Sequence, residues 1–219
     1  MLEAMLGMLV GAFLIIRVEE LRKPRLALRM IAPHSADYPE GRPAKQGHVV
    51  TLEAVNEVLP RWARWMSRNA AQQCRALVTF HHMDGQNIFG RSMPVKWVRT
   101  PEALPMPIHL PDGQLFGLLV DPERIMREPR VDIAPGEASE LDVAVRFDNE
   151  SECYGWNMDS YKSTPPWRNP TWRLAAGRYL VRVQVFSGDQ SCTGLFRLIN
   201  DVPADAFRLA PALTTDKVM

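Results

Sequence analysis

The chain has 219 residues, of which 46% are apolar and 23% are charged, and its formal net charge is +1. This composition is typical of a folded protein rather than a disordered chain, and the small net charge argues against nucleic acid as a partner. Three cysteines (Cys74, Cys153 and Cys192) lie at spacings that fit neither a disulfide framework nor a zinc site. We therefore expect a well-cored domain with no metal and no cofactor.

The first feature along the chain is an apolar run. Residues 4–16 carry no charge, and this run of 13 ends at Arg17. It is shorter than the roughly 20 residues that cross a bilayer, so a signal peptide, a buried core helix and a membrane anchor all compete as interpretations. No small-residue cleavage site follows Ile16, and apolar residues occupy every face of the helix, which favours the anchor. We predict a membrane anchor with a helical extension over residues 1–24, in contact with the lipid bilayer through residues 1–18.

Basic residues outnumber acidic ones just after this run. The basic residues are Arg17, Arg22, Lys23, Arg25 and Arg29, against Glu19 and Glu20. The positive-inside rule places such residues on the cytoplasmic side of a span, and unpatterned cysteines fit a reducing compartment. The expected topology is a single pass in the cytoplasmic membrane, with the large domain on the cytoplasmic side.

Short strand patterns, separated by turn signals, follow the apolar run. They lie at residues 24–31, 47–58, 73–82, 87–90 or 93–98, 133–148 and 177–200. Glycine-containing turns are expected at Asp84-Gly85, Pro135-Gly136 and Gly188-Asp189. Strands of this length joined by tight turns indicate antiparallel pairing.

Two of these segments alternate with the period of two that is typical of a β-strand. In the first, one face is expected to carry Leu141, Val143, Val145 and Phe147, and the other Asp142, Ala144 and Arg146. In the second, one face is expected to carry Tyr179, Val181, Val183 and Val185. Both strands are therefore predicted to bury one face against a core.

About seven such strands, with no long helix among them, predict an all-β fold: an antiparallel immunoglobulin-like β-sandwich over residues 25–200. The spacing Leu174-x-x-Gly177-x-Tyr179 resembles the tyrosine corner of such domains, in which the tyrosine hydroxyl bonds back to nearby backbone. The remaining segments are expected to be long loop insertions at 59–73 and 100–130 and a mostly flexible tail at 201–219.

A narrower resemblance rests on CYGWNMDSY at 153–161 followed by WRNPTWRLAAGRYLVRV at 167–183. This pair of segments is similar to a group of prokaryotic proteins that join an N-terminal membrane helix to one immunoglobulin-like (fibronectin-like) β-domain. Those proteins have no established activity. The resemblance therefore implies an anchor and a sandwich, and it carries over no catalytic residue.

Aromatic side chains are concentrated in the segment 152–172. They are Tyr154, Trp156, Tyr161, Trp167 and Trp172. One interpretation is a binding face that stacks on sugars, a peptide or an apolar patch of a partner, because Trp and Tyr are enriched at binding hot spots. The other is a folded cover over the open end of the sandwich, since a long connection must bury something to stay ordered.

A second aromatic segment lies in the first insertion and alternates with basic residues, as Arg61, Trp62, Arg64 and Trp65. Three-residue spacing puts both tryptophans on one face of a short helix. Such a helix is a candidate for the membrane interface, where Trp and Arg suit the boundary. The alternative is an insertion helix packed on the sandwich.

The adjacent histidines His81 and His82 point to opposite faces of a strand, so they are not expected to bind one metal ion. No catalytic motif stands out. The expected function is a non-enzymatic, membrane-tethered interaction module that binds a protein partner at the membrane surface. The alternative is an extracytoplasmic carbohydrate- or envelope-binding module that uses the aromatic segment 152–172.

Overall fold

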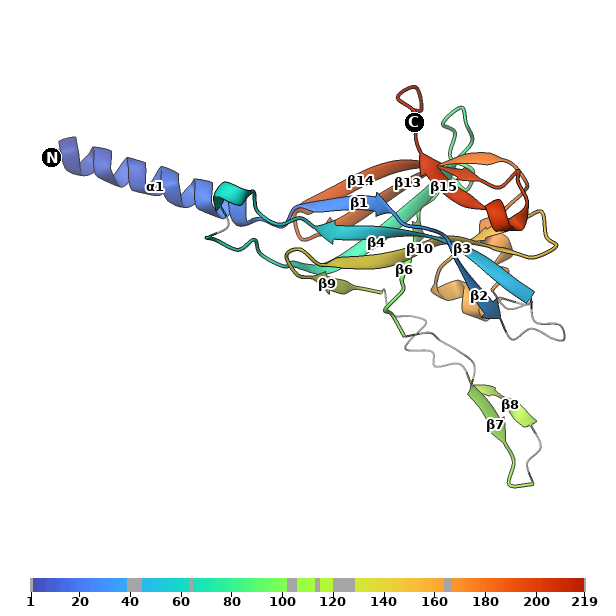
Figure 1. Cartoon of the computed structure of the whole chain (residues 1–219). Helices are drawn as coiled ribbons and strands as arrows, with labels where there is room; N and C mark the ends of the chain where they lie inside the picture. Colours follow the sequence, from blue (N-terminus) through green and yellow to red (C-terminus); the bar gives the residue numbers. More distant parts are fainter. Residues whose placement is uncertain are drawn as a thin grey trace.

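The computed structural model describes residues 2–38, 45–63, 65–101, 106–112, 115–119, 129–163 and 167–218. They form two antiparallel sheets, a separate two-stranded ribbon and an N-terminal helix (Figure 1). The two sheets face each other across a shared apolar core. The predicted all-β sandwich is thereby confirmed at the level of its architecture.

The first sheet has seven strands in the order β1-β3-β10-β11-β12, with β2 also paired to β3 and β6 to β10. Its members are β1 (Leu26–Met30), β2 (His34–Tyr38), β3 (Lys45–Asn56), β6 (Lys96–Trp97), β10 (Ala138–Phe147), β11 (Cys153–Gly155) and β12 (Arg173–Leu174). The long strands β3 and β10 form its centre.

The second sheet has six strands in the order β15-β14-β13-β4-β5, with β9 also paired to β4. Its members are β4 (Ala71–His81), β5 (Met93–Pro94), β9 (Val131–Ile133), β13 (Arg178–Ser187), β14 (Gln190–Ile199) and β15 (Arg208–Pro211). The strands predicted at 73–82 and 177–200 are therefore present, and they pair with each other through β4 and β13.

The chain passes from one sheet to the other within five residues. Met93 and Pro94 pair with β4 in the second sheet, whereas Lys96 and Trp97 pair with β10 in the first. Met93 and Trp97 are completely buried. This short segment therefore ties the two sheets together through the core.

The remaining elements are short apart from one helix. They are α1 (Leu2–Arg22), the 3-10 turns η1 (Arg61–Ala63), η2 (Met158–Lys162), η3 (Pro170–Trp172) and η4 (Ala204–Ala206), and the ribbon strands β7 (Met106–His109) and β8 (Leu115–Leu119). Figure 1 shows α1 and the ribbon extending away from the sandwich in different directions.

The predicted alternation along β10 is wrong at its middle. The register of β10 against β3 shifts between Asp142 and Ala144, which marks a β-bulge. A bulge inserts an extra residue, so the alternation of faces restarts after it. Leu141 and Val143 therefore lie in the core between the sheets, whereas Val145 and Phe147 lie in a second apolar cluster on the outer face of the first sheet.

Two of the predicted glycine turns and the predicted tyrosine hydrogen bond are present. Gly136 and Gly188, in two of the predicted turns, have positive φ angles of 82° and 58°, a conformation that glycine adopts without strain. The Tyr179 hydroxyl donates to the Ala175 carbonyl at 2.9 Å. A side chain at Gly177 would lie 3.2 Å from that hydroxyl, so glycine leaves room for this hydrogen bond.

The C-terminal segment is more structured than the predicted flexible tail. Phe207 is 1% exposed and belongs to the main core, and β15 pairs with β14. Arg197 in β14 binds both carboxylate oxygens of Asp216, at 2.7 and 2.6 Å. Residues as far as 216 are thus part of the folded sandwich.

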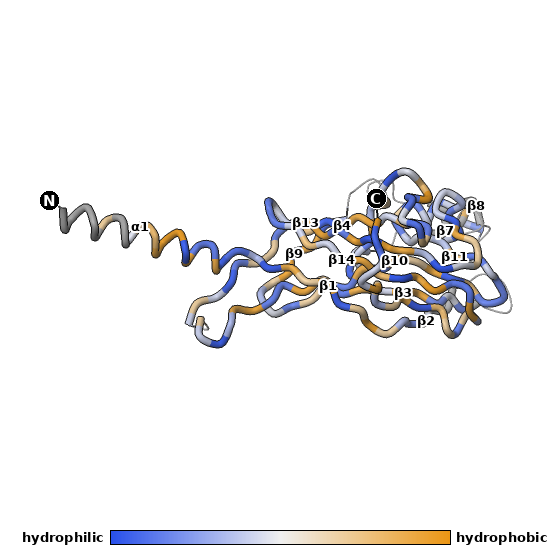
Figure 2. The backbone as a smooth tube through the Cα atoms, turned by 90° about the horizontal axis from the view of Figure 1, so that it is seen from above, coloured by the Kyte–Doolittle hydropathy of each residue, from blue (hydrophilic) through white to orange (hydrophobic). Residues whose placement is uncertain are grey.

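The predicted membrane-spanning helix requires a correction. Among the described residues, no helix combines the length and the apolar character needed to cross a bilayer. α1 has 21 residues, but its last two turns include charged side chains at Arg17, Glu19, Glu20 and Arg22. Its apolar run of 13 residues is only about 20 Å long, against a hydrocarbon layer of about 30 Å. Figure 2 shows the described part of α1 changing from hydrophobic to hydrophilic toward the sheets.

Candidate functional site

The five aromatic residues proposed as a binding face are buried. Their exposed fractions are 7% for Tyr154, 2% for Trp156, 5% for Tyr161, 7% for Trp167 and 5% for Trp172. Rings with so little exposed surface have no face available for a ligand. The geometry therefore favours the cover over the binding face, although the cover lies elsewhere than expected.

The cover lies on the outer face of the first sheet and not at an open end of the sandwich. Val145 is the direct neighbour of Val49 on β3 and of Tyr154 on β11, and all three side chains belong to the outer cluster. Trp156 and Trp167 pack over this surface, with their ring centroids 6.2 Å apart. Together they bury a face of the sheet that water would otherwise cover.

The rings of the cover interlock in edge-on contacts. Tyr161 meets Trp156 edge-on at 5.6 Å between centroids and Trp167 at 6.4 Å. Each such contact is worth about 0.5–1.5 kcal/mol beyond the burial of area. The Arg168 guanidinium lies 3.9 Å from the Phe147 ring centroid and binds Glu150 at 2.9 Å.

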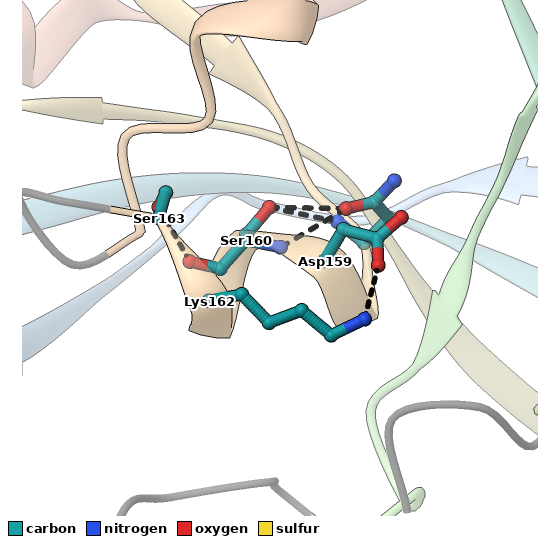
Figure 3. Close-up of polar contacts among 5 residues, drawn as sticks. Asp159, Ser160, Lys162 and Ser163 are labelled. Carbon is teal, nitrogen blue, oxygen red and sulfur yellow. Dashed lines mark hydrogen bonds and ion pairs between the residues drawn. The ribbon is translucent and has the colours of Figure 1, made fainter. Parts of the chain in front are cut away.

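The short turn η2 holds the middle of the cover in shape (Figure 3). The Asn157 side chain accepts from the Ser160 amide at 3.1 Å, and the Asn157 amide donates to the Ser160 hydroxyl at 3.3 Å. This reciprocal pair is a capping box. Ser163 and Lys162 add a hydroxyl bond to the Ser160 carbonyl at 2.7 Å and an ion pair to Asp159 at 3.0 Å.

The backbone at Trp167 is strained. Its φ angle is 64°, a left-handed conformation that is costly for a bulky residue. Its amide donates to the Ser160 carbonyl at 2.9 Å. The hydrogen bond and the burial of the indole ring hold this conformation, which indicates a tightly determined cover.

A polar cavity of about 460 Å³ borders the cover beside η3. Its lining includes Arg91, Asn157, Asp159, Lys162 and Trp172. The Arg91 guanidinium lies 4.8 Å over the Trp172 ring, and Phe89 meets the same ring edge-on at 5.0 Å. The one aromatic ring among the described lining residues is thus already engaged within the protein.

The interface candidates in the first insertion have the opposite environment. Trp62 is 68% exposed and Trp65 is 78% exposed, and Arg61 is also exposed. Arg64 lies outside the described residues. The segment is fixed to the sandwich by Leu59 and Ala63, which are 4% and 0% exposed, so the insertion packs on the sandwich without burying its tryptophans.

The described apolar side chains of α1 are also exposed. Phe13, Leu14, Ile15 and Ile16 are 55–66% exposed, and α1 extends from one end of the sandwich in both Figure 1 and Figure 2. The Arg17 guanidinium lies 4.9 Å over the Phe13 ring. This part of the helix therefore presents an apolar surface that the described part of the sandwich does not cover.

Hydrogen bonds join the end of α1 to the insertion. The Asn69 amide donates to the Arg22 carbonyl at 2.7 Å, and Arg68 Nη1 donates to the Lys23 carbonyl at 2.7 Å. Fully buried Asn56 donates through Nδ2 to the carbonyls of Asn69 and Ile133, at 2.9 and 3.1 Å. The exposed helix, the exposed tryptophans and the sandwich thus form one connected corner.

A buried polar row crosses the outer face of the first sheet. Thr51, Asp142 and Lys96 are direct neighbours on β3, β10 and β6, and each is less than 10% exposed. Thr51 Oγ1 donates to Asp142 at 2.8 Å. Burial raises the pKa of Asp142 above its ordinary 3.8, and the Thr51 hydrogen bond and the Lys96 charge offset part of that rise.

Chemistry-bearing side chains are otherwise dispersed. His81 is buried and His82 is exposed, as expected for neighbours on a strand. Within the described ranges, no three side chains of His, Cys, Asp or Glu gather to hold a metal ion. Burial, with the charges of Glu150 and Glu152, raises the pKa of the Tyr154 hydroxyl to about 12, so this hydroxyl stays protonated at neutral pH.

The roles of two buried polar residues, Asn56 and Asp142, were not predicted from the sequence. Asn56 stands at the end of a predicted strand and Asp142 at an alternating position, so both resemble ordinary polar residues of a β-protein. Their roles depend on partners 13 to 91 residues away. No local signal marks such partners.

Comparisons with protein-family profiles, with curated proteins and with solved structures found no match.

Proposed function

We propose that this chain is a non-enzymatic interaction module held at a membrane surface by α1. The observation that carries the proposal is the exposure of Phe13, Leu14, Ile15 and Ile16 on a helix that extends from the sandwich. Contiguous exposed apolar surface marks a protein or membrane contact. The run is too short to span a bilayer, so we propose insertion into one leaflet.

The basic residues that follow the apolar run support this location. Arg17 is exposed and makes no ion pair with the described residues, whereas Arg22 and Lys23 are paired with Glu19 and Glu20. A cation just outside the hydrocarbon layer is attracted to anionic headgroups. Such lipids are enriched in the cytoplasmic leaflet, which is the side on which we propose that the sandwich lies.

We propose further that the module binds a protein there, in part through the ribbon. Strands β7 and β8 pair with each other and, among the described residues, with neither sheet. A two-stranded ribbon alone is marginally stable in water. A protein that pairs with or packs on this ribbon would stabilise it.

The carbohydrate-binding alternative loses its main support. It depends on open aromatic faces in the segment 152–172, and those rings are buried in the cover or in the sandwich core. No second function is therefore proposed.

The test is sedimentation of the full chain with vesicles of phosphatidylcholine alone and of phosphatidylcholine mixed with phosphatidylglycerol. We expect wild type to sediment with vesicles. We expect a Phe13→Gln/Ile15→Gln/Ile16→Gln variant to bind them at least roughly a hundredfold more weakly, because three large side chains no longer enter lipid. Met83→Gln/Leu213→Gln is the matched control. Those side chains are 41% and 55% exposed but lie outside α1, so the control is expected to bind as wild type does.

Wild type that stays in solution with every vesicle composition would contradict the proposal. Equal loss of binding in the α1 variant and in the control would also contradict it. All the substituted side chains are exposed, so we expect equal melting temperatures for the three proteins. Thermal melts of the same protein preparations without vesicles measure them.

A further inference from the structure

The tryptophans of this chain fall into two distinct groups. Four of the six are nearly inaccessible to solvent, with exposed fractions of 0–7% for Trp97, Trp156, Trp167 and Trp172. Trp62 and Trp65 are 68% and 78% exposed. Large aromatic side chains are costly to leave in water, because each carries about 150–250 Å² of mostly apolar surface. Two of them exposed within four residues of the chain point to a surface that receives them.

The position of these two residues is set by the end of α1. The segment that carries them runs from η1 to Asn69, whose amide binds the Arg22 carbonyl at 2.7 Å. Arg68, 9% exposed, binds the next carbonyl of the chain, at Lys23. The end of the segment that carries Trp62 and Trp65 is therefore attached to the end of α1.

The height of this attachment above the hydrocarbon layer can be estimated from helix geometry. Arg22 follows Ile16, the last residue of the apolar run, by six residues, which is about 9 Å along a helix. The headgroup layer on each side of a bilayer is about 5–8 Å thick. With Ile16 at the edge of the hydrocarbon layer and α1 tilted by about 30° from the membrane normal, which is within the usual range, the Arg22 carbonyl lies about 8 Å above that edge. The carbonyl and the segment bound to it then come to the outer part of the headgroup layer.

We infer that Trp62 and Trp65 form a second lipid contact, which enters the headgroup layer and fixes the orientation of the sandwich on the membrane. This inference rests on the proposed membrane association of α1. Indole rings favour the boundary between headgroups and hydrocarbon, where one end is apolar and the other polar. Arg61, exposed and without an ion pair among the described residues, adds a charge complementary to anionic headgroups.

A lipid surface explains these features better than a protein partner does. The segment that carries the tryptophans is attached to the end of α1 by the hydrogen bonds at Arg22 and Lys23, so one flat surface at this corner can receive both the helix and the tryptophans. The segment is also rigidly attached. Asn56 connects it to β9 and accepts from the Arg25 amide at 3.1 Å. Two attachment points on a rigid body hold one orientation, whereas α1 alone leaves the sandwich free to pivot.

Tryptophan fluorescence gives a direct test, because only Trp62 and Trp65 are accessible to a quencher in solution. The probes are vesicles of phosphatidylcholine alone and of equal parts phosphatidylcholine and phosphatidylglycerol, each with or without a lipid that carries a spin label on its headgroup. We expect acrylamide to quench the free protein, vesicles to suppress that quenching, and the spin-labelled lipid to quench in its place. A Trp62→Phe/Trp65→Phe variant should bind vesicles but lose the quenching by spin-labelled lipid.

Two further variants measure the strength of the contact. Trp62→Ala/Trp65→Ala should weaken vesicle binding by roughly tenfold or more, since two large apolar surfaces no longer leave water. Arg61→Gln should reduce the preference for vesicles that contain phosphatidylglycerol and leave binding to phosphatidylcholine unchanged. Leu213→Ala, an exposed apolar side chain of the C-terminal segment, should alter neither property.

The outcomes separate this inference from the proposed function. Vesicle binding that leaves Trp62 and Trp65 open to acrylamide and insensitive to headgroup-labelled lipid would overturn the second contact and retain the α1 anchor. Absence of binding to every vesicle composition would overturn both the second contact and the α1 anchor. Protection from acrylamide without vesicles, together with a mass of two chains in solution, would overturn the lipid contact in favour of a second copy of this chain.

Discussion

At the scale of single residues, burial rather than residue type decides what an aromatic side chain does. Trp156 and Trp65 are chemically identical, yet one is 2% exposed and the other 78%. Both lie in segments with other aromatic and polar neighbours, so composition does not separate them. The difference arises because β10 turns Val145 and Phe147 outward and thereby creates an apolar surface for Trp156.

Substitution of each tryptophan by alanine should therefore have different effects on stability. Trp156→Ala should lower the free energy of unfolding by about 3–5 kcal/mol, because it leaves a cavity beneath Tyr161 and Trp167. Trp65→Ala should change it by less than about 0.5 kcal/mol. Urea denaturation of the two variants measures both. Equally small losses would show that the cover does not pack tightly on the sheet.

At the scale of elements, alternation predicts strands well and their irregularities poorly. The core face of β13 and the hydroxyl bond of Tyr179 were predictable, because both follow from positions within one short stretch of sequence. The bulge after Asp142 was not, because a bulge leaves the alternating letters unchanged while it reverses the faces of all later residues.

Other elements were missed because their partners are distant or their signals are weak. Strand β15 has four residues and includes a proline, a composition that reads as a loop. The location of the aromatic cover could not be predicted from the sequence either, because it depends on the outward turn of β10. The exposure of Trp62 could have been inferred only from the packing of Leu59 and Ala63.

The C-terminal segment is held by a carboxylate whose contribution depends on pH. Arg197 makes two hydrogen bonds to Asp216 and holds the pKa of that carboxyl below its ordinary 3.8. A carboxyl with a lowered pKa in the folded state stabilises fully above its unfolded pKa, and the contribution is lost as the pH falls through the folded pKa.

Asp216→Asn should thus lower the melting temperature near neutral pH, and the difference from wild type should shrink as the pH falls below about 3.8. Thermal melts across this range measure the effect. Asp201→Asn is the control, because the exposed pair of Asp201 with Arg178 is expected to contribute little. A difference between Asp216→Asn and wild type that persists unchanged in acid would contradict the ion pair.

At the scale of the whole molecule, the sandwich and α1 are joined at one corner, where the end of the helix binds the first insertion. The described hydrogen bonds from the sandwich to the helix region begin at the Arg22 carbonyl. The apolar side chains at 13–16 are exposed and lie well before that point. The fold of the sandwich therefore has little need of most of α1.

Removal of residues 1–20 should leave the melting temperature within about 2 °C of that of the full chain, because it removes mainly exposed surface. Removal of residues 1–24 should lower it further. That deletion takes away the carbonyl that accepts from Arg68 and leaves a buried guanidinium group without its partner. Calorimetry of the three chains measures both shifts. A large drop already at residue 20 would mean that α1 packs on the sandwich.

The pairing of β3 with β10 also has a consequence for the order in which the chain acquires structure during synthesis. The two strands are separated by about 80 residues along the chain. The separation between the paired strands β4 and β13 is larger still. At about 5–20 residues per second, the first sheet cannot close for several seconds after β3 has left the ribosome. Throughout that interval α1 has already emerged. Under the membrane association proposed above, the helix is available to a membrane before the sandwich exists, and the sandwich would complete its fold at that surface.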